Sequence, residues 1–435
     1  MTKLRFLLRF PTVPSWRPIC LPWTLKMLWL RAPLFALLLP LVRCPFSSQD
    51  EPSVIGPMVG HVGSEAAAIW AYLGPGESAE LRWWASDRPE EAKTAVMTAN
   101  ADRHNSTVAE LDELRPLTRY EYRLSWRGQT RPTWQGSFRT APPPGEVGRF
   151  KMAVSSCMHI DDVRQSSWYL LLAQHPSFHL LLGDNVYADS TDYERLWGQH
   201  LRYRTVPEFA GVLRQVPTYA MWDDHDFGPN DSDSTAEGKE DSLRAFEGLW
   251  ANPGAGTNDT PGAFFRFSWG EVDFFVLDGR YYRTPNDAPD DEHKRMLGDA
   301  QFDWLMAELR MSRAKFKVLA SGSTLQASRQ DGWRRFSYAR DRLYRALGEA
   351  AVSGVLYLSG DLHSCLLQMH ATEDTIGYPL PEVISSGITR SNTQGFATLE
   401  FDTAREDPSV RVQILHGDGG IQVDRTFLLS ELSRH

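Results

Sequence analysis

Six apolar segments after residue 150 each end in a short polar run, and this regularity restricts the fold more than any other feature of the 435-residue chain. Helical stretches such as 192–204 and 300–312 separate the apolar segments. Alternation of strand and helix predicts an α/β fold with helices on the faces of the sheet. Ligands of such folds bind beyond the carboxyl ends of the strands, so the polar runs are expected to meet in one crevice. In chain order the runs are SSCMH (155–159), GDNVYAD (183–189), WDDHDFGPND (222–231), LDGR (277–280), SGST (321–324) and SGDLHS (359–364).

The residue types in these runs are those of a multinuclear metal site. A single Asp after a strand usually caps a helix or forms a turn, but six such coincidences favour a shared site. Carboxylates are hard ligands that bridge ions, imidazole suits iron or zinc, and thiolate favours a transition metal. Two neighbouring ions polarise a phosphoryl group and generate hydroxide, and the planar guanidinium of Arg280 suits phosphate oxygens. The residues alone therefore predict metal-assisted hydrolysis of a phosphoester.

The ordered set of runs, from SSC to GDLHS, resembles the alkaline phosphatase D (PhoD-like) family of the calcineurin-like metallophosphoesterase superfamily. The resemblance extends from about residue 52 to about residue 430. It implies a four-layer αββα metallophosphoesterase domain over residues 149–430, preceded by a small β-sandwich. It also implies a hydrolase that acts on phosphate monoesters or diesters through a metal-bound hydroxide. The cofactors that the resemblance implies are Fe3+ and Ca2+, and the implied substrate is a small phosphoester.

The family pattern carries over, residue by residue, onto two ion sites. At the first site, a thiolate and a phenolate among the matched ligands make iron(III) the expected ion. The expected ligands of this ion are Cys157, Asp184, Tyr187, Asp361 and His363. Asp184 matches a bridging carboxylate, so it is expected at the second site as well. Further oxygen ligands there suit calcium, and the matched residues are Asp224 and Asn230.

Two more residues are expected to act on the substrate. His225 matches the family histidine that contacts phosphate or donates a proton to the leaving oxygen. Arg280 is expected to stabilise the developing negative charge, although Gly279 stands before it where relatives more often have Thr. His225 and Arg280 are therefore the predicted catalytic residues.

Other polar residues of the runs have two open interpretations. Asn185 and Asp189 either contact the second ion or cap the following helix. Asp223 and Asp226 are either outer groups of the metal site or caps, and Asp231 is expected to be a solvated loop residue.

Residues 53–139 show a different pattern, with short alternating segments separated by turn-forming residues and no helical period. Several short strands at this spacing predict an all-β sandwich, which we place at residues 52–140. Leu114, Leu117 and Tyr120 match a tyrosine corner, in which the Tyr hydroxyl bonds back to the backbone. The stretch resembles a fibronectin type III or immunoglobulin-like module, and the Pro/Gly-rich residues 140–148 read as a linker.

Residues 1–48 are predicted to be a leader. Basic residues precede an apolar run at 32–42, and no acidic residue occurs before Asp50, which is the layout of a secretory signal. The run is shorter than the roughly 20 apolar residues that span a membrane. A protein that is secreted, periplasmic or tethered on the outer side of a membrane through its N-terminus is expected. The alternative is a spurious N-terminal extension.

The formal net charge of −9 argues against a specific nucleic-acid partner, which would need a basic surface. No feature of the sequence indicates an obligate protein partner. Two alternative functions stay open, of which the first is a phospholipase-type phosphodiesterase acting on lipid or cell-wall phosphodiesters. The second is a secreted binding protein whose metal site is only structural. A structural site fills its coordination sphere, whereas a catalytic site keeps an open position.

Overall fold

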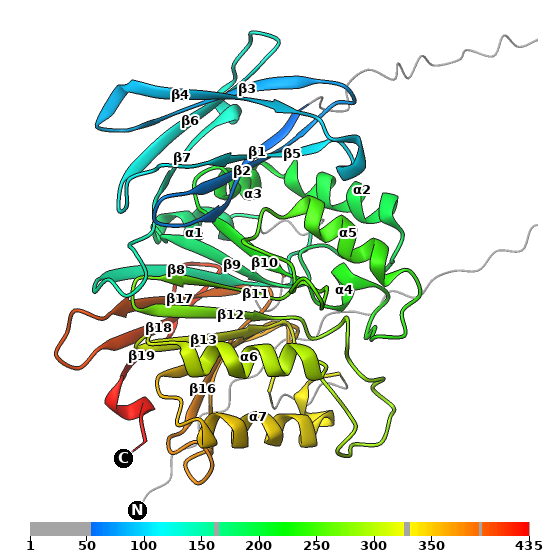
Figure 1. Ribbon diagram of the computed structural model, residues 1–435, viewed down its shortest axis with the longest axis vertical. Helices are drawn as coiled ribbons and strands as arrows, with labels where there is room; N and C mark the ends of the chain where they lie inside the picture. The colour runs from blue at the N-terminus through cyan, green and yellow to red at the C-terminus, as the bar shows by residue number, and fades with distance from the viewer. Residues whose placement is uncertain (1–53, 161–164, 326–330, 391–393, 435) are drawn as a thin grey trace, which may run out of the picture. The chain divides into compact units, whose positions relative to one another are not determined.

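The computed structural model of the protein describes residues 54–160, 165–325, 331–390 and 394–434 (Figure 1). The predicted leader at 1–48 lies outside these ranges. Within them, no helix is long and apolar enough to cross a membrane.

The first part of the described chain consists of two antiparallel sheets. One has the order β1 (Val54–Val62), β2 (Ala67–Leu73), β5 (Ser106–Leu111), and the other has β4 (Arg88–Thr98), β3 (Ser78–Ala85), β6 (Arg119–Trp126), β7 (Gln135–Arg139). Short 3-10 turns lie at Ala101–Arg103 and Pro132–Trp134. Side chains of β3 are alternately exposed and buried, because successive residues of a strand point to opposite faces. Ile69, Leu81 and Leu124 belong to the core that the two sheets share. The Tyr120 hydroxyl accepts a hydrogen bond from the backbone N–H of Arg115 at 2.9 Å, as a tyrosine corner requires.

Two six-stranded mixed sheets form the rest of the fold. The first has the order β10 (Thr218–Met221), β9 (Phe178–Leu182), β8 (Arg149–Ser155), β17 (Gly395–Asp402), β18 (Ser409–His416), β19 (Ile421–Leu428). The second has the order β11 (Phe265–Trp269), β12 (Val272–Leu277), β13 (Phe316–Ser321), β14 (Val355–Ser359), β16 (Leu380–Ser385), β15 (Cys365–His370). The strands that precede the six polar runs are β8, β9, β10, β12, β13 and β14, and they pair in parallel within their own sheets.

Alternate residues of the first sheet separate two hydrophobic cores. Leu180 and Leu182 pack with Phe274 and Leu319 of the second sheet, whereas Leu181 packs with the helices. The helices on that side are α1 (Ser167–Ala173), α2 (Tyr193–Arg204), α3 (Pro207–Leu213), α4 (Asp224–Phe227) and α5 (Lys239–Leu249). The core between the sheets continues to α6 (Asp299–Met311) and α7 (Ser337–Glu349), which cover the second sheet (Figure 1). Two further 3-10 turns lie at Trp333–Arg335 and Ser430–Leu432. The predicted α/β class is confirmed, and it is built on two mixed sheets that share one hydrophobic core.

The sandwich packs directly on the α/β part, and Asp50–His435 form one compact unit. The indole N–H of Trp70 donates to the carbonyl of Gly248 at 2.8 Å, and the Tyr122 hydroxyl donates to the carbonyl of Arg214 at 2.8 Å. The Arg204 guanidinium lies 5.0 Å from the Trp70 ring and 4.3 Å from the Trp250 ring, so one buried cation joins both parts. These contacts fix the sandwich against the helical side of the first sheet.

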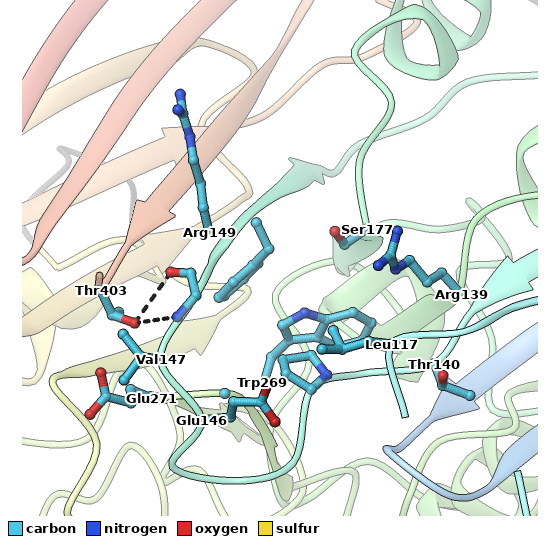
Figure 2. Close-up of a pocket in the computed structure, with 14 residues that line it drawn as sticks. Leu117, Arg139, Thr140, Glu146, Val147, Arg149, Ser177, Trp269, Glu271 and Thr403 are labelled. Atoms are coloured by element: carbon cyan, nitrogen blue, oxygen red, sulfur yellow. Dashed lines mark hydrogen bonds between the residues drawn. The ribbon is translucent and has the colours of Figure 1, made fainter. Parts of the chain in front are cut away.

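A cavity of about 340 Å³ lies where the predicted linker passes the two sheets (Figure 2). Thr140, Glu146, Trp269 and Thr403 are among the residues that line it. None of its lining residues belongs to the six polar runs, so this cavity is separate from the candidate metal centre.

Candidate metal centre

The turns after β8, β9 and β14 hold their polar residues in a strained backbone conformation. Cys157, Asp184, Asp361 and His363 have φ values of 55°, 50°, 61° and 53°. Left-handed backbone costs a non-glycine residue on the order of 1–3 kcal/mol and persists only where the surroundings enforce it. Four predicted ligands therefore share a conformation that is typical of functional sites.

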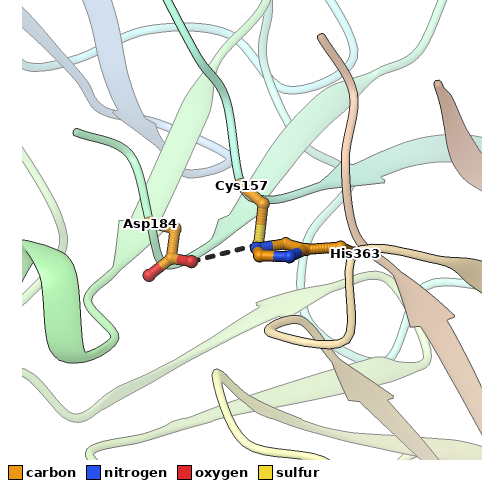
Figure 3. Close-up of side chains that lie close together, drawn as sticks. All are labelled: Cys157, Asp184 and His363. Atoms are coloured by element: carbon orange, nitrogen blue, oxygen red, sulfur yellow. Dashed lines mark hydrogen bonds between the residues drawn. The ribbon is translucent and has the colours of Figure 1, made fainter. Parts of the chain in front are cut away.

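The first group of ligand atoms comes from three of these turns. One ligand atom each of Cys157, Asp184 and His363 lie within 4.8 Å of one another (Figure 3). Cys157 Sγ is 3.2 Å from Asp184 Oδ2, and the Tyr187 hydroxyl is 3.2 Å from the same oxygen and 3.5 Å from His363 Nε2. The structure thus brings Cys157, Asp184, Tyr187 and His363 together.

Two of the predicted ligands of the first ion, Asp184 of this group and Asp361, which the group does not include, have a buried carboxylate oxygen without a donor in the described part of the chain. Asp184 Oδ1 and Asp361 Oδ2 are buried without a hydrogen-bond partner among the described residues. An unpaired buried carboxylate is costly, so its oxygens need a partner that the chain itself does not supply. The available donors are a thiolate sulfur, carboxylate and phenolate oxygens and an imidazole nitrogen. This set fits a cation at this position.

Burial, followed by the charges of Asp224 and Asp223, raises the pKa of Asp184 well above its usual range. Burial and the charge of Asp184 likewise raise the pKa of the Cys157 thiol. Both groups must lose a proton to bind a metal ion, and a bound cation favours the deprotonated form. Metal and ligand ionisation are therefore expected to be coupled at this site.

A second group shares Asp184 with the first. Ligand atoms of Asp184, Asp224 and His225 lie within 4.8 Å of one another. Asp224 is the first residue of α4, and its Oδ2 accepts the backbone N–H of Asp231 at 2.8 Å. Burial acts to raise the pKa of Asp224, but the charges of Arg280 and His225 lower it to about 2. Asp224 is thus ionised before any second cation binds.

Asp226 and Asn185 connect the loops that carry the two groups. The Asp226 carboxylate accepts backbone N–H groups of Asn185 at 2.9 Å, of Val186 at 3.2 Å and of Asp223 at 3.1 Å. The Asn185 side-chain amide donates to the carbonyl of Met221 at 2.7 Å. The contact with Asp223 closes a capping box at the start of α4, so the prediction that Asp223 and Asp226 are caps is confirmed, and Asp226 also joins the loop after β9 to the loop after β10.

Asp189 does not cap the next helix, because Asp192 takes that position and accepts the backbone N–H of Arg195 at 2.8 Å. Instead, Asp189 Oδ1 is 2.5 Å from His225 Nδ1. The His225 ring lies 4.3 Å from the Tyr187 ring. A carboxylate on Nδ1 favours the tautomer that carries its proton there and leaves Nε2 as the free position.

Arg280 is completely buried and its donors bind protein acceptors. Its Nε donates to Asp223 Oδ1 at 2.6 Å, its Nη2 to Asp331 Oδ2 at 2.7 Å, and its Nη1 to the carbonyl of Ser232 at 3.3 Å. Gly322 of the SGST run leaves room for the Asp223 carboxylate that Arg280 binds, because a Cβ on Gly322 would lie 2.5 Å from Asp223 Oδ1. This guanidinium therefore offsets part of the negative charge of the acidic run after β10.

Asp331 was missed by sequence reasoning, since it follows no apolar strand and lies outside the six runs. One ligand atom each of Asp224, Asp231 and Asp331 lie within 4.8 Å of one another. Asp231 lies in a loop as predicted, but it is half-buried, and its backbone N–H donates to Asp224 Oδ2. The Asn230 side chain is exposed in the turn after α4, and its role as a ligand stays a prediction.

The profile of a family described as PhoD-like phosphatase matches residues 152–426, which is more than half of the chain. This protein belongs to the PhoD-like phosphatase family. The resemblance inferred from the ordered runs is thereby confirmed.

Among individual relatives of this PhoD-like chain, alkaline phosphatase D of Bacillus subtilis (strain 168) is 22% identical over 382 residues, which covers 72% of this chain. The match spans 64% of that relative, less than two thirds of its length. The solved structure of PhoD has a TM-score of 0.73 at 17% identity and covers 88% of this chain and 90% of its own. The structure of purple acid phosphatase PPD1 from yellow lupin (Lupinus luteus) seeds has a TM-score of 0.64 at 13% identity. The match covers 86% of this chain and 74% of the lupin chain. Both structures show that the PhoD-like chain shares their fold.

Proposed function

We propose that this PhoD-like protein hydrolyses phosphate esters at a two-metal centre. The observation that carries the proposal is the position of Asp184, whose carboxylate belongs to both ligand groups. A carboxylate between two sets of donors is the arrangement that a bridging ligand requires. Two metal ions bound there would polarise the phosphoryl oxygen and lower the pKa of a bound water.

We assign the residues of the centre to two ions, one for each of the two groups of ligand atoms that share Asp184. Thiolate and phenolate donors favour Fe3+ at the first position, and oxygen donors favour Ca2+ at the second. The proposed ligands are Cys157, Asp184, Tyr187, Asp361 and His363 for the first ion and Asp184, Asp224 and Asn230 for the second.

His225 would deliver a proton to the leaving oxygen of the ester from Nε2 of its doubly protonated ring, whose Nδ1–H donates to Asp189. Its Nδ1 is occupied by Asp189 at 2.5 Å, which orients the ring and reserves Nε2 for the substrate. Arg280 would support the centre without contacting the substrate. Its bonds to Asp223 and Asp331 hold two carboxylates in place and offset their charge. We therefore assign Arg280 a positioning role in addition to the charge stabilisation predicted from the sequence.

The chain organisation is proposed on the same basis. We assign residues 149–430 to a four-layer metallophosphoesterase domain and residues 52–140 to a fibronectin type III-like sandwich, which agrees with the strand order of its two sheets. Residues 1–48 are proposed as a leader that directs the protein to the outer side of a membrane, either secreted, periplasmic or tethered.

Metal analysis combined with hydrolysis of a chromogenic phosphate monoester and diester at alkaline pH tests the proposal. We expect about two metal ions per chain and turnover of at least one substrate. The ratio of the two rates distinguishes a monoesterase from a phosphodiesterase. A fully loaded protein without activity on either ester would contradict the proposal and favour a binding protein with a structural metal site.

A further inference from the structure

The backbone after β16 is tied to the loop that carries Cys157. The N–H groups of Gly387 and Ile388 donate to the carbonyl of Ser156 at 3.0 and 3.3 Å. The Thr389 hydroxyl accepts the N–H of His159 at 2.5 Å and donates to its carbonyl at 3.0 Å. The next residue, Arg390, is therefore held in a defined position beside the first ligand group.

The Arg390 side chain turns toward that group. Its Nη2 donates to the Tyr187 hydroxyl at 2.6 Å, and its guanidinium carbon lies 5.0 Å from the centre of the Tyr187 ring. The residue is half-buried, and its Nε has no hydrogen-bond partner among the described residues. A guanidinium has five N–H donors in a planar fork, so one bond to Tyr187 leaves donors for another ligand.

Arg280 and Arg390 differ in how many of their N–H donors remain free of protein acceptors among the described residues. Arg280 is completely buried, and Asp223, Asp331 and Ser232 accept from its three nitrogens. Arg390 is partly exposed, and no carboxylate of the described residues lies within salt-bridge distance of it. A phosphate ester that enters between buried carboxylates needs positive charge within hydrogen-bond reach, and guanidinium binds phosphate oxygens in bidentate geometry.

We propose that Arg390 is the phosphate-binding arginine of this site, with its guanidinium stacked on Tyr187 and its remaining donors on oxygens of the substrate phosphate. The proposal rests on the proposed function, because it assumes a phosphate ester at the metal centre. It assigns substrate contact to a residue outside all six polar runs. Tyr187 would then have two roles, since its hydroxyl binds the first ion and its ring packs against the Arg390 guanidinium.

Binding of inorganic phosphate to the metal-loaded protein, measured by calorimetry, tests the proposal without turnover. Loss of a charge-assisted hydrogen bond costs about 1.5–3 kcal/mol, so Arg390→Ala is expected to weaken phosphate binding roughly tenfold to a hundredfold. Arg390→Lys keeps the charge but loses the fork, and an intermediate loss is expected. Metal content should equal that of the unchanged protein in both variants. Arg340→Ala on α7, which removes another partly buried arginine bonded to Asp341, is the matched control and should leave phosphate binding unchanged.

Kinetics with a phosphate monoester provide a second readout. Arg390→Ala should raise KM by the same factor as it weakens phosphate binding, whereas a purely structural defect would appear as lost metal. Unchanged phosphate affinity in a fully loaded Arg390→Ala protein would overturn the proposal. Loss of metal with unchanged phosphate affinity per loaded site would overturn it too, since Arg390 would then only support Tyr187. If the unchanged protein binds phosphate but hydrolyses no ester, the proposed function fails while the role of Arg390 is still decided by the binding data.

Discussion

At the scale of single residues, Asp184 faces the strongest conflict between folding and function. It is 1% exposed, one of its oxygens has no partner among the described residues, and Asp224 and Asp223 raise its pKa further. Burying such a carboxyl stabilises the protein only when a cation is present. The residue is thus a cost to the metal-free fold that metal binding offsets.

Asp184→Asn is expected to remove most of the bound metal and to lower activity by more than about a hundredfold, beyond the 10–100-fold typical of outer residues of metal sites. The metal-free variant should melt at a higher temperature than the metal-free parent, because the cost of burying an ionisable carboxyl is removed. Metal analysis, ester hydrolysis and thermal melting check these outcomes. Asp241→Asn, at an exposed position on α5, is the control and should change none of them. A variant that retained metal and activity would refute the assignment.

His225 and Asp189 form a pair in which one residue acts and the other orients it. His225→Ala should lower kcat roughly 10²–10⁴-fold, the usual contribution of a general acid. Asp189→Asn should lower kcat less, because the imidazole remains and only its orientation is lost. Steady-state kinetics on an ester with a poor leaving group measure both effects. Equal activity of Asp189→Asn and the parent would show that the 2.5 Å contact has no role in turnover.

At the scale of elements, the turn after β9 places Asp184 through Gly183. Gly183 has φ of 87°, and a Cβ there would lie 2.5 Å from both the backbone nitrogen and the Cβ of Asp223. Only glycine permits the loops after β9 and β10 to approach this closely. The spacing between Asp184 and Asp224 therefore depends on a residue that binds nothing.

Gly183→Ala is expected to destabilise the fold by about 2–4 kcal/mol, the sum of left-handed strain and overpacking. It should also reduce metal content, since the two ligand loops move apart. Gly198 in α2 is the matched control, because its Cβ would meet nothing within 4 Å. Gly198→Ala should gain about 0.5–1 kcal/mol from helix propensity. Urea unfolding measures both, and similar values for the two variants would contradict the argument.

At the scale of the whole molecule, a half-buried histidine lies at the junction of the sandwich and the α/β part. His61 Nδ1 lies 3.2 Å from the Tyr219 hydroxyl, and that hydroxyl donates to the carbonyl of Val62 at 3.1 Å. Burial lowers the pKa of His61 from 6.5 to about 4. The folded state therefore holds this imidazole neutral at the junction.

Acid should weaken the molecule through this residue. Between pH 6.5 and 4 the unfolded chain binds a proton at His61 that the folded chain does not, so stability falls as the pH falls through this window. By linkage, His61 lowers the free energy of unfolding by about 2 kcal/mol at pH 5 relative to neutral pH. This loss becomes constant below the pKa of the folded state. His61→Gln should lose correspondingly less stability than the parent between pH 7.5 and pH 5 in urea unfolding. Parallel pH profiles for the two proteins would contradict the neutral state of His61.

The sequence by itself determined the residues whose position follows from a strand end. Cys157, Asp184, Asp224 and His363 each come within a few residues of an apolar segment, and the carboxyl ends of parallel strands bring such residues to one edge. The α/β class and the alternating sandwich strands were predictable from local periodicity, whereas the family followed from the resemblance of the six ordered runs to its pattern.

Only the tertiary structure decided what approaches that edge from elsewhere. Asp331 and Arg390 belong to none of the six polar runs, and each reaches the site through loop contacts between segments far apart in the chain. The partners of Arg280 were likewise unpredictable, since Asp223 lies 57 residues away and Asp331 lies 51 residues away. Periodicity records which face a residue occupies, whereas long-range side-chain pairs depend on how the two sheets stack. The stacking of the two sheets brought Asp223 and Arg280, from strand ends of different sheets, into a 2.6 Å contact.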